Sequence, residues 1–87
     1  MAVYDIAFKR QVEKDLRKID QRYRKTILDD IEKLKKNPRP ANSRKLSGTE
    51  MTHRLRVGDY RVIYQVDDKN KIITVFYVRH RKDAYKK

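Results

Sequence analysis

The residues best equipped for chemistry are mostly cations, and they fall in two short stretches. The stretch THRLRVGDYR supplies Arg54, Arg56 and Arg61. The stretch VRHRKDAY follows an apolar run and supplies Arg79, His80, Arg81, Lys82 and Tyr85. Arginine grips phosphate oxygens through a planar fork and stays charged, and histidine titrates near neutral pH. Two interpretations remain open, a solvated tail that aids solubility or half of a site for an anionic partner.

The overall charge strengthens the second interpretation. The chain has 87 residues, 24 of them Lys or Arg and 12 Asp or Glu, giving a net charge of +12. Such a charge attracts polyanions, so nucleic acid is the first candidate partner, followed by an anionic membrane surface and an acidic protein. The apolar residues are strongly periodic, which argues against a disordered chain.

Length and composition exclude several other classes. Eighty-seven residues predict one domain, 1–87, with a thin core, because a chain this short buries only about 60% of its unfolded surface. No cysteine and only two histidines, His53 and His80, predict no metal site and no cofactor. No apolar run of ~18 residues and no signal-peptide pattern occur, so we expect a cytoplasmic protein that does not span a membrane.

The first half of the chain reads as a short strand and two helices. Residues 3–8 partly alternate, and apolar residues then recur every three or four positions through residue 34: Val12, Leu16, Ile19, Tyr23, Ile27, Leu28, Ile31 and Leu34. One helix over 9–36 would be about 42 Å long, so we expect a break at Asp20, a good N-cap. Asn37-Pro38 ends the helix, and the stretch KNPRPANSRKLSGTE reads as a linker.

The second half reads as an antiparallel meander. Residues 53–57 alternate, Gly58-Asp59 predicts a two-residue hairpin turn, and residues 60–66 and 72–79 are rich in strand formers. Two helices before a meander predict an α+β fold. If 67–71 form a five-residue turn, Val66 faces Ile72, and Arg79 and Arg81 join Arg61; a four-residue turn would send them to the other face.

The hairpin register predicts an arginine-rich face. Arg56 lies opposite Arg61 and Arg54 opposite Ile63, so all three arginines share one side while Leu55 and its alternating neighbours face the helices. Like charges across a strand pair repel. A solvated face accounts for any one arginine, whereas the three together favour an anion site. Taken alone, Tyr85 suits a packing residue better than a catalytic one, His80 a structural histidine, and Lys82 a contribution to general electrostatics. Asp59 and Asp83 suit local partners of arginine better than catalytic bases.

The chain resembles the RelE/ParE toxin superfamily, and within it the RelE branch. The resemblance rests on the arginine-rich stretches quoted above and on three further strings, Lys45-Leu46-Ser47-Gly48, Tyr60-Arg61-Val62-Ile63-Tyr64 and His80-Arg81-Lys82-Asp83-x-Tyr85. The resemblance implies a microbial-ribonuclease-like fold of two helices on an antiparallel sheet. It implies a toxin that cuts messenger RNA in the ribosomal A site. It also implies a small RelB-like antitoxin, which we expect to be acidic given the basic charge of this chain.

The resemblance also implies roles for single residues. Arg61 would stabilise charge on the scissile phosphate, Arg81 would be the candidate general acid for the 5′ oxygen, and Tyr85 would orient or stack on a base. Lys45, Arg54, Arg56, Arg79 and Lys82 are the expected RNA- and phosphate-binding residues. Arg54 and Thr52 stand at positions where the resembled family often has lysine, which leaves the identity of the general base open.

Physical chemistry supports a metal-independent endoribonuclease in outline. The RNA 2′-OH is the nucleophile, so the enzyme must align it, accept its proton, stabilise a phosphorane and protonate the leaving oxygen. Arginine transfers protons poorly because its pKa exceeds about 12, so His80 stays a candidate catalyst. Three alternatives remain: a ParE-type toxin that targets gyrase, a non-catalytic nucleic-acid-binding module, and a ribosome-associated housekeeping protein.

Overall fold

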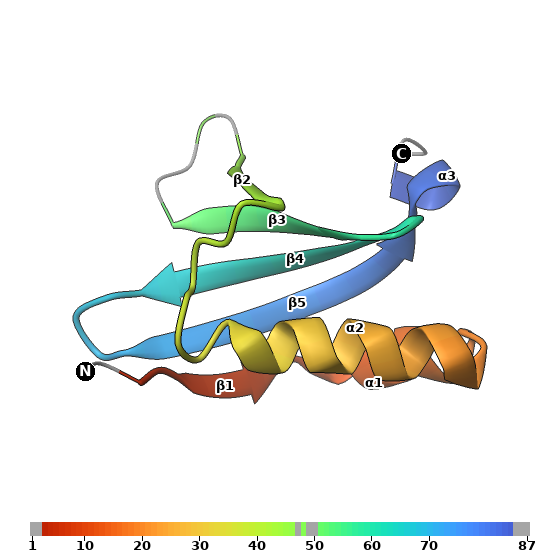
Figure 1. Ribbon diagram of the computed structural model, residues 1–87, viewed down its shortest axis with the longest axis horizontal. Coiled ribbons are helices and arrows are strands. Elements are labelled where there is room, and N and C mark those ends of the chain that lie inside the picture. The colour runs from red at the N-terminus through yellow and green to blue at the C-terminus, as the bar shows by residue number, and fades with distance from the viewer. Residues whose placement is uncertain (1–2, 47, 49–50, 85–87) are drawn as a thin grey trace.

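The computed structural model, which describes residues 3–46, 48 and 51–84, is a sheet with the first two helices packed on one side and a short third helix at the end of the last strand (Figure 1). The sheet has five strands in the order β1-β5-β4-β3-β2; β1 runs parallel to β5, and the other pairs are antiparallel. The elements are β1 Asp5–Phe8, α1 Arg10–Arg17, α2 Gln21–Lys33, β2 Ser43–Lys45, β3 Thr52–Val57, β4 Tyr60–Asp67, β5 Ile72–His80 and α3 Arg81–Ala84. The α+β expectation is confirmed. Within the described residues, no helix is long and apolar enough to cross a membrane.

The predicted helix break lies where the sequence placed it. The Asp20 side chain accepts a hydrogen bond from the Arg22 backbone N–H at 2.9 Å, which satisfies a donor of the first turn of α2. Regular helix ends at Lys33, somewhat before the predicted stop at Asn37-Pro38. The Asn37 N–H still bonds back to the Lys33 carbonyl at 3.2 Å, so the last turn unwinds gradually.

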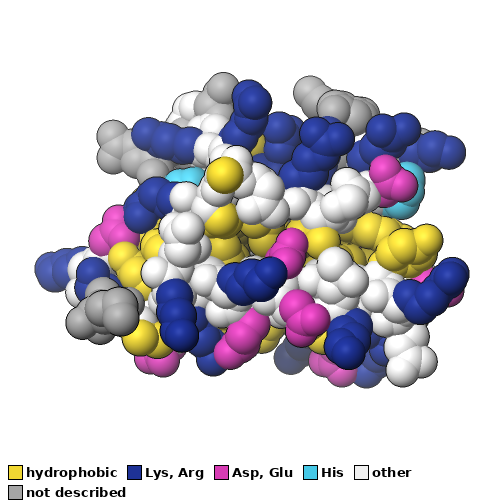
Figure 2. All heavy atoms as spheres, viewed as in Figure 1, with side chains coloured by type: hydrophobic (Ala, Val, Ile, Leu, Met, Phe, Trp, Pro, Cys, Tyr) yellow, Lys and Arg dark blue, Asp and Glu magenta, His cyan; other side chains and the backbone are white. Residues whose placement is uncertain are grey.

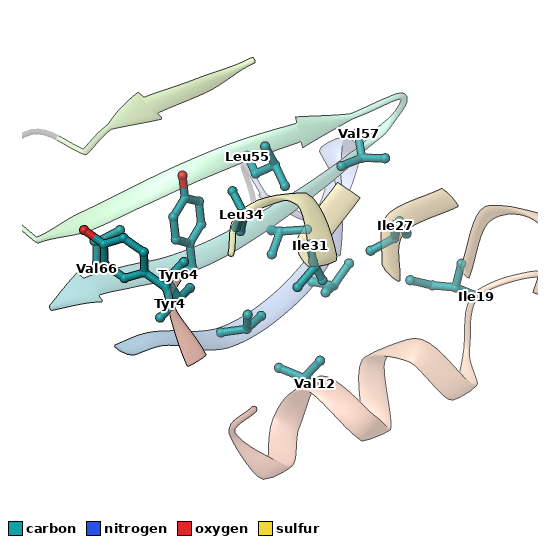
Figure 3. Packing of buried hydrophobic residues seen from close by; sticks show 14 residues of the cluster. Tyr4, Val12, Ile19, Ile27, Ile31, Leu34, Leu55, Val57, Tyr64 and Val66 are labelled. Carbon is teal, nitrogen blue, oxygen red and sulfur yellow. The ribbon is translucent and has the colours of Figure 1, made fainter. Parts of the chain in front are cut away.

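The core lies between the two helices and the sheet (Figure 3). Ile27, Ile31 and Leu34 of α2 and its end pack against Leu55 and Tyr64 of β3 and β4. Three of the apolar residues expected in the helical stripe are not fully buried: Tyr23 is 51% exposed, Leu28 is 37% exposed, and Leu16 is half-buried. The buried stripe of the helices is narrower than the apolar stripe expected from the sequence, because the small sheet covers only part of the surface of α2.

The β3–β4 hairpin has the predicted register. Val57 pairs with Tyr60 and Arg56 with Arg61 across the Gly58-Asp59 turn. Gly58 has φ +58°, a left-handed conformation that favours glycine. The two arginines therefore share the face of the sheet away from the helices, while Val57 lies on the buried face.

The predicted register of the β4–β5 turn is wrong. Val66 pairs with Ile73 and not with Ile72, and the turn has four residues, 68–71. This register alone would have turned Arg79 toward the helices. A β-bulge at Ile63/Tyr64 shifts the pairing by one residue, so Arg79 lies directly opposite Arg61 after all. Arg79 thus lies on the predicted face of the sheet because of the bulge, which no local sequence pattern indicates.

The predicted linker contains a strand. Ser43–Lys45 forms β2, an edge strand paired antiparallel with β3. The prolines precede it, and the Pro38 carbonyl accepts a 2.7 Å hydrogen bond from the buried Tyr64 hydroxyl, which fixes the path into β2. The three-residue strand is too short for an alternation pattern to predict it.

Candidate functional site

The face of the sheet away from the helices carries an array of cations, which we call the arginine face. It comprises Arg44, Arg54, Arg56, Arg61 and Arg79. The register sets Arg44 opposite Arg54, Arg56 opposite Arg61, and Arg61 opposite Arg79. Three like-charge pairs across neighbouring strands are destabilising by themselves, so a polyanion bound here would relieve repulsion that the fold maintains.

The surface view agrees with this arrangement. Figure 2 shows Lys and Arg side chains gathered along the upper edge of the molecule, over β2 and β3 and beside α3. The lower part of the same view alternates Lys and Arg with Asp and Glu. In this view the cations along the upper edge have few acidic neighbours, which favours anion binding there.

One hollow brings four of the predicted site residues together. A space of about 460 Å³ is lined by Arg56, Gly58, Arg61, Arg81 and Lys82. The lining joins β3 and β4 to α3, which begins where β5 ends. A glycine at the turn contributes no side chain, so the guanidinium groups border an open space large enough for a phosphate and part of a sugar.

Asp59 attaches α3 to this hollow. Its carbonyl accepts a 2.7 Å hydrogen bond from the Arg81 N–H, and its carboxylate lies 4.0 Å from Arg81 Nε. Both ionic side chains are more than half exposed, so the backbone bond is the firmer of the two links. Asp59 thus holds Arg81 beside Arg61, in agreement with its predicted role as a local arginine partner.

Two more hollows adjoin the first, and Arg61 lines all three. One of about 360 Å³ includes Asn42, Arg44, Arg54 and Arg56. The other, of about 150 Å³, is lined by Leu46, Arg54, Arg61, Ile63, Tyr77 and Arg79. Arg61 is therefore the central residue of the arginine face.

His80 does not belong to this group. It pairs with Tyr60, and its ring contacts the Tyr60 ring edge-on at 5.2 Å, on the side of the sheet that carries the helices. Its Nδ1 accepts the Lys82 N–H at 3.2 Å. Because His80 directly follows Arg79 in β5, strand alternation turns the His80 side chain to the opposite face of the sheet from Arg79 and Arg61. The structure therefore argues against the expectation that His80 shares the arginine site.

Lys45 is also turned away from the arginines. It pairs with His53, whose buried ring stacks on Tyr64 with 5.4 Å between ring centroids. Burial lowers the pKa of His53, and the nearby charges of Arg39 and Lys45 lower it further, while the Met51 carbonyl opposes them. The neighbouring Arg44 occupies the position on the arginine face. Tyr85 lies outside the described residues.

The Arg79 side chain forms an ion pair with Asp15 of α1, which lies beside the part of β5 that β1 does not cover. Asp15 is only 7% exposed, and its carboxylate accepts hydrogen bonds from the Arg79 guanidinium, the Val78 N–H at 2.9 Å and the Gln11 amide at 3.0 Å. β1 pairs with β5 only through Val75, so Asp15 takes the place of a strand partner at Val78. Arg79 is thus a partly neutralised member of the arginine face.

Sequence reasoning missed three residues that shape this site, Arg44, Asp15 and Tyr77. Asp15 had a readable signal, because it lies three residues after Val12 and four before Ile19, within the apolar stripe of the helix. An acid on a buried stripe indicates a buried partner. Arg44 and Tyr77 had no such signal, since their positions depend on β2 and on the bulge.

Comparison with known proteins places this geometry in a family. Residues 6–85 match the family described as "ParE toxin of type II toxin-antitoxin system, parDE". The chain is 31% identical over 86 residues to the protein of Methanocaldococcus jannaschii named RelE1, covering 95% of this chain and 96% of that one.

Solved structures agree. The RelE–RelB complex from Pyrococcus horikoshii OT3 contains a chain 32% identical, with a TM-score of 0.82 and coverage of 93% of this chain and 97% of that one. The intact RelBE complex of E. coli gives 29% identity, a TM-score of 0.74 and coverage of 88% and 95%. The chain therefore belongs to the RelE/ParE superfamily of type II toxin–antitoxin toxins, and within it to the RelE type.

Proposed function

We propose that this toxin is a ribosome-dependent endoribonuclease that cuts messenger RNA in the A site and stops translation. The observation that carries the proposal is the hollow where Arg61 and Arg81 meet, flanked by Arg56 and Lys82. Four cations around one space of about 460 Å³ suit a phosphodiester whose charge increases during the reaction.

The proposed reaction uses the nucleophile that RNA itself carries. The 2′-hydroxyl loses its proton to solvent water as its oxygen attacks the adjacent phosphorus. A bond forms between oxygen and phosphorus, the bond to the 5′-oxygen breaks, and that oxygen gains a proton, which leaves a 2′,3′-cyclic phosphate and a 5′-hydroxyl. Arg61 binds the non-bridging oxygens as negative charge grows on them. Arg81, which Asp59 holds at the edge of the hollow, is the candidate donor of the proton to the leaving oxygen.

The dominance of arginine supports dependence on the ribosome. Guanidinium groups stabilise charge well but exchange protons poorly near neutral pH. Because the His80 ring lies against Tyr60 on the other side of the sheet, its imidazole cannot act as an acid or base for a phosphate bound at Arg61. Such a site depends on accurate alignment of the 2′-oxygen, which is worth several powers of ten in rate. A message held in the A site would provide that alignment.

The proposed partner of the free toxin is an acidic, RelB-like antitoxin. The Pyrococcus horikoshii and E. coli relatives were solved in complex with RelB. The charge of +12 favours an acidic partner by long-range attraction. An antitoxin of this kind would neutralise the arginine face and prevent RNA from binding.

The test is primer extension on a translated message, with and without ribosomes, followed by analysis of the cleaved ends. The wild-type chain should cut only with ribosomes present and leave cyclic phosphate ends. Arg61→Ala should slow cleavage about 10²–10³-fold, the usual cost of losing one preorganised donor, and Arg81→Ala should cost at least as much. His80→Ala should cleave at close to the wild-type rate.

Arg17→Ala is the matched control. Arg17 is an exposed arginine of α1 in an i,i+4 ion pair with Glu13, away from the arginine face, and its loss changes the net charge equally. Equal cleavage of naked and translated RNA would refute ribosome dependence. No cleavage in either condition would refute the nuclease proposal and favour a gyrase-directed toxin or a non-catalytic binding module.

A further inference from the structure

The aromatic ring of Tyr77 lies on the arginine face and is not accounted for by packing. Tyr77 is 36% exposed and pairs with the buried residue Ile63, and both residues line the hollow of about 150 Å³. The guanidinium carbon of Arg79 lies 4.7 Å from the centroid of the Tyr77 ring. Ring and guanidinium thus form a single unit next to Arg54 and Arg61.

The bulge in β4–β5 places this unit. Continued from the turn, the pairing Val66–Ile73 would set Ile63 opposite Phe76 and Arg61 opposite Val78. The one-residue shift at Ile63/Tyr64 brings Tyr77 and Arg79 into those places. A bulge leaves one residue unpaired and is a common means of redirecting side chains next to functional sites.

The distance between the Tyr77 and Arg61 positions is close to the distance between a base and its own phosphate in one nucleotide. Tyr77 pairs with Ile63, two residues from Arg61, so the two side chains are diagonal neighbours across β4 and β5. Diagonal positions lie about 7–8 Å apart, within reach of an aromatic ring and a long side chain. A phosphate at Arg61 would therefore bring an attached base over the Tyr77 ring.

We propose that Tyr77 and Arg79 form a stacking platform for one base of the RNA strand whose phosphate is bound at Arg61. Single-stranded RNA is held in general by aromatic rings and guanidinium planes on which unstacked bases lie. Asp15 supports the platform, because its buried carboxylate fixes the Arg79 guanidinium from the side of α1. The inference rests on the proposed function in that it takes RNA as the ligand.

The first test uses tryptophan fluorescence, because the chain contains no tryptophan. Tyr77→Trp introduces a single reporter at the platform. The ligands are a 2′-O-methyl RNA hexamer, which lacks the nucleophile and stays intact, and an abasic oligomer with the same number of phosphates. We expect the hexamer to quench the fluorescence strongly and the abasic oligomer to leave it nearly unchanged.

Tyr23→Trp is the matched control. Tyr23 is likewise exposed and has an arginine, Arg22, 5.5 Å from its ring centroid, but it lies on α2, on the other side of the sheet. Neither oligomer should quench this reporter. Equal quenching of the Tyr77→Trp variant by both oligomers would overturn the proposal, because it would show a response to charge alone.

The second test measures affinity for the two oligomers by fluorescence anisotropy. Tyr77→Leu should bind the hexamer roughly 5- to 150-fold more weakly, the range for losing one base–aromatic stack, while Tyr77→Phe should retain the affinity. Binding of the abasic oligomer should not change in either variant. A Tyr77→Leu variant that binds the hexamer as well as the wild type would refute the platform.

Binding and cleavage separate the two proposals. The oligomer experiments need no catalysis, so they can succeed even if ribosome-dependent cleavage is absent. Conversely, normal cleavage together with equal affinity for base-bearing and abasic oligomers would leave the nuclease intact and eliminate the platform.

Discussion

Replacement of Asp15 by alanine should destabilise the protein far more than replacement of any exposed acid on the same helix. The Asp15 side chain is 8% exposed and accepts hydrogen bonds from Val78, Arg79 and Gln11. Without it, the Val78 N–H at the edge of β5 loses its partner, which costs about 1–3 kcal/mol. The Arg79 side chain is 33% exposed, so water compensates in part, and the lost ion pair adds about 1 kcal/mol.

The expected total is about 2–4 kcal/mol of unfolding free energy, measured by urea denaturation followed by circular dichroism. The free energy of unfolding of a domain of this size is roughly 4–13 kcal/mol, so the expected loss is a large fraction of the total stability. The midpoint of thermal unfolding should fall by about 8–30 °C. Asp15→Asn should lie between wild type and Asp15→Ala, because the amide oxygen still accepts one hydrogen bond but the charge is lost.

Glu13→Ala is the control for this prediction. Glu13 lies two residues away on α1, its loss changes the net charge equally, and its ion pair with Arg17 is 67% and 72% exposed. Exposed pairs are worth about 0–1 kcal/mol. If Glu13→Ala and Asp15→Ala lost the same free energy, the buried contacts of Asp15 would not be what attaches α1 to β5, and the reasoning would be refuted.

Three further predictions concern pH, the hairpin turn and the antitoxin. The pKa of His53 is lowered in the folded state, so the neutral ring contributes fully to the free energy of unfolding above the unfolded pKa of 6.5, and this contribution is lost as pH falls through the lower folded pKa. Urea denaturation at a series of pH values should show this loss of stability in the wild type and in His80→Gln but not in His53→Phe. Gly58→Ala should cost about 1–2 kcal/mol by thermal unfolding, because φ is +58° while an added Cβ meets nothing within 4 Å; an unchanged stability would contradict the assigned turn. Association with an acidic antitoxin should slow as ionic strength rises, since screening acts within about 8–10 Å at physiological salt, and stopped-flow rates indifferent to salt would count against charge steering.

Much of the architecture was readable because it depends on local patterns. The strand at the N-terminus, the Asp20 break and the Gly58-Asp59 hairpin each follow from a few adjacent residues whose physical demands are strong. The hairpin alone fixed Arg56 opposite Arg61, since a two-residue turn permits one register. Fold class and the centre of the site therefore came from short-range information.

The remaining parts of the site depend on contacts between distant segments. β2 exists because three residues after the prolines meet the edge of β3, and Arg44 joins the arginine face only through that pairing. His80 and Arg79 are neighbours in sequence, yet alternation in a strand sends them to opposite sides, so their common motif says nothing of a common site.

By itself, the sequence determined the charge, the helix break at Asp20 and the Gly58-Asp59 hairpin turn, because these depend on composition and on contacts within a few residues, and its motifs indicated the family. Tertiary structure alone decided which cations meet. The four-residue turn by itself would place Arg79 on the helix side of the sheet, and the one-residue shift at the bulge returns it to the other side. Only the two together set Arg79 opposite Arg61. Asp15 likewise acquires its role only when α1 packs on the free edge of β5, 63 residues away from Val78 in sequence.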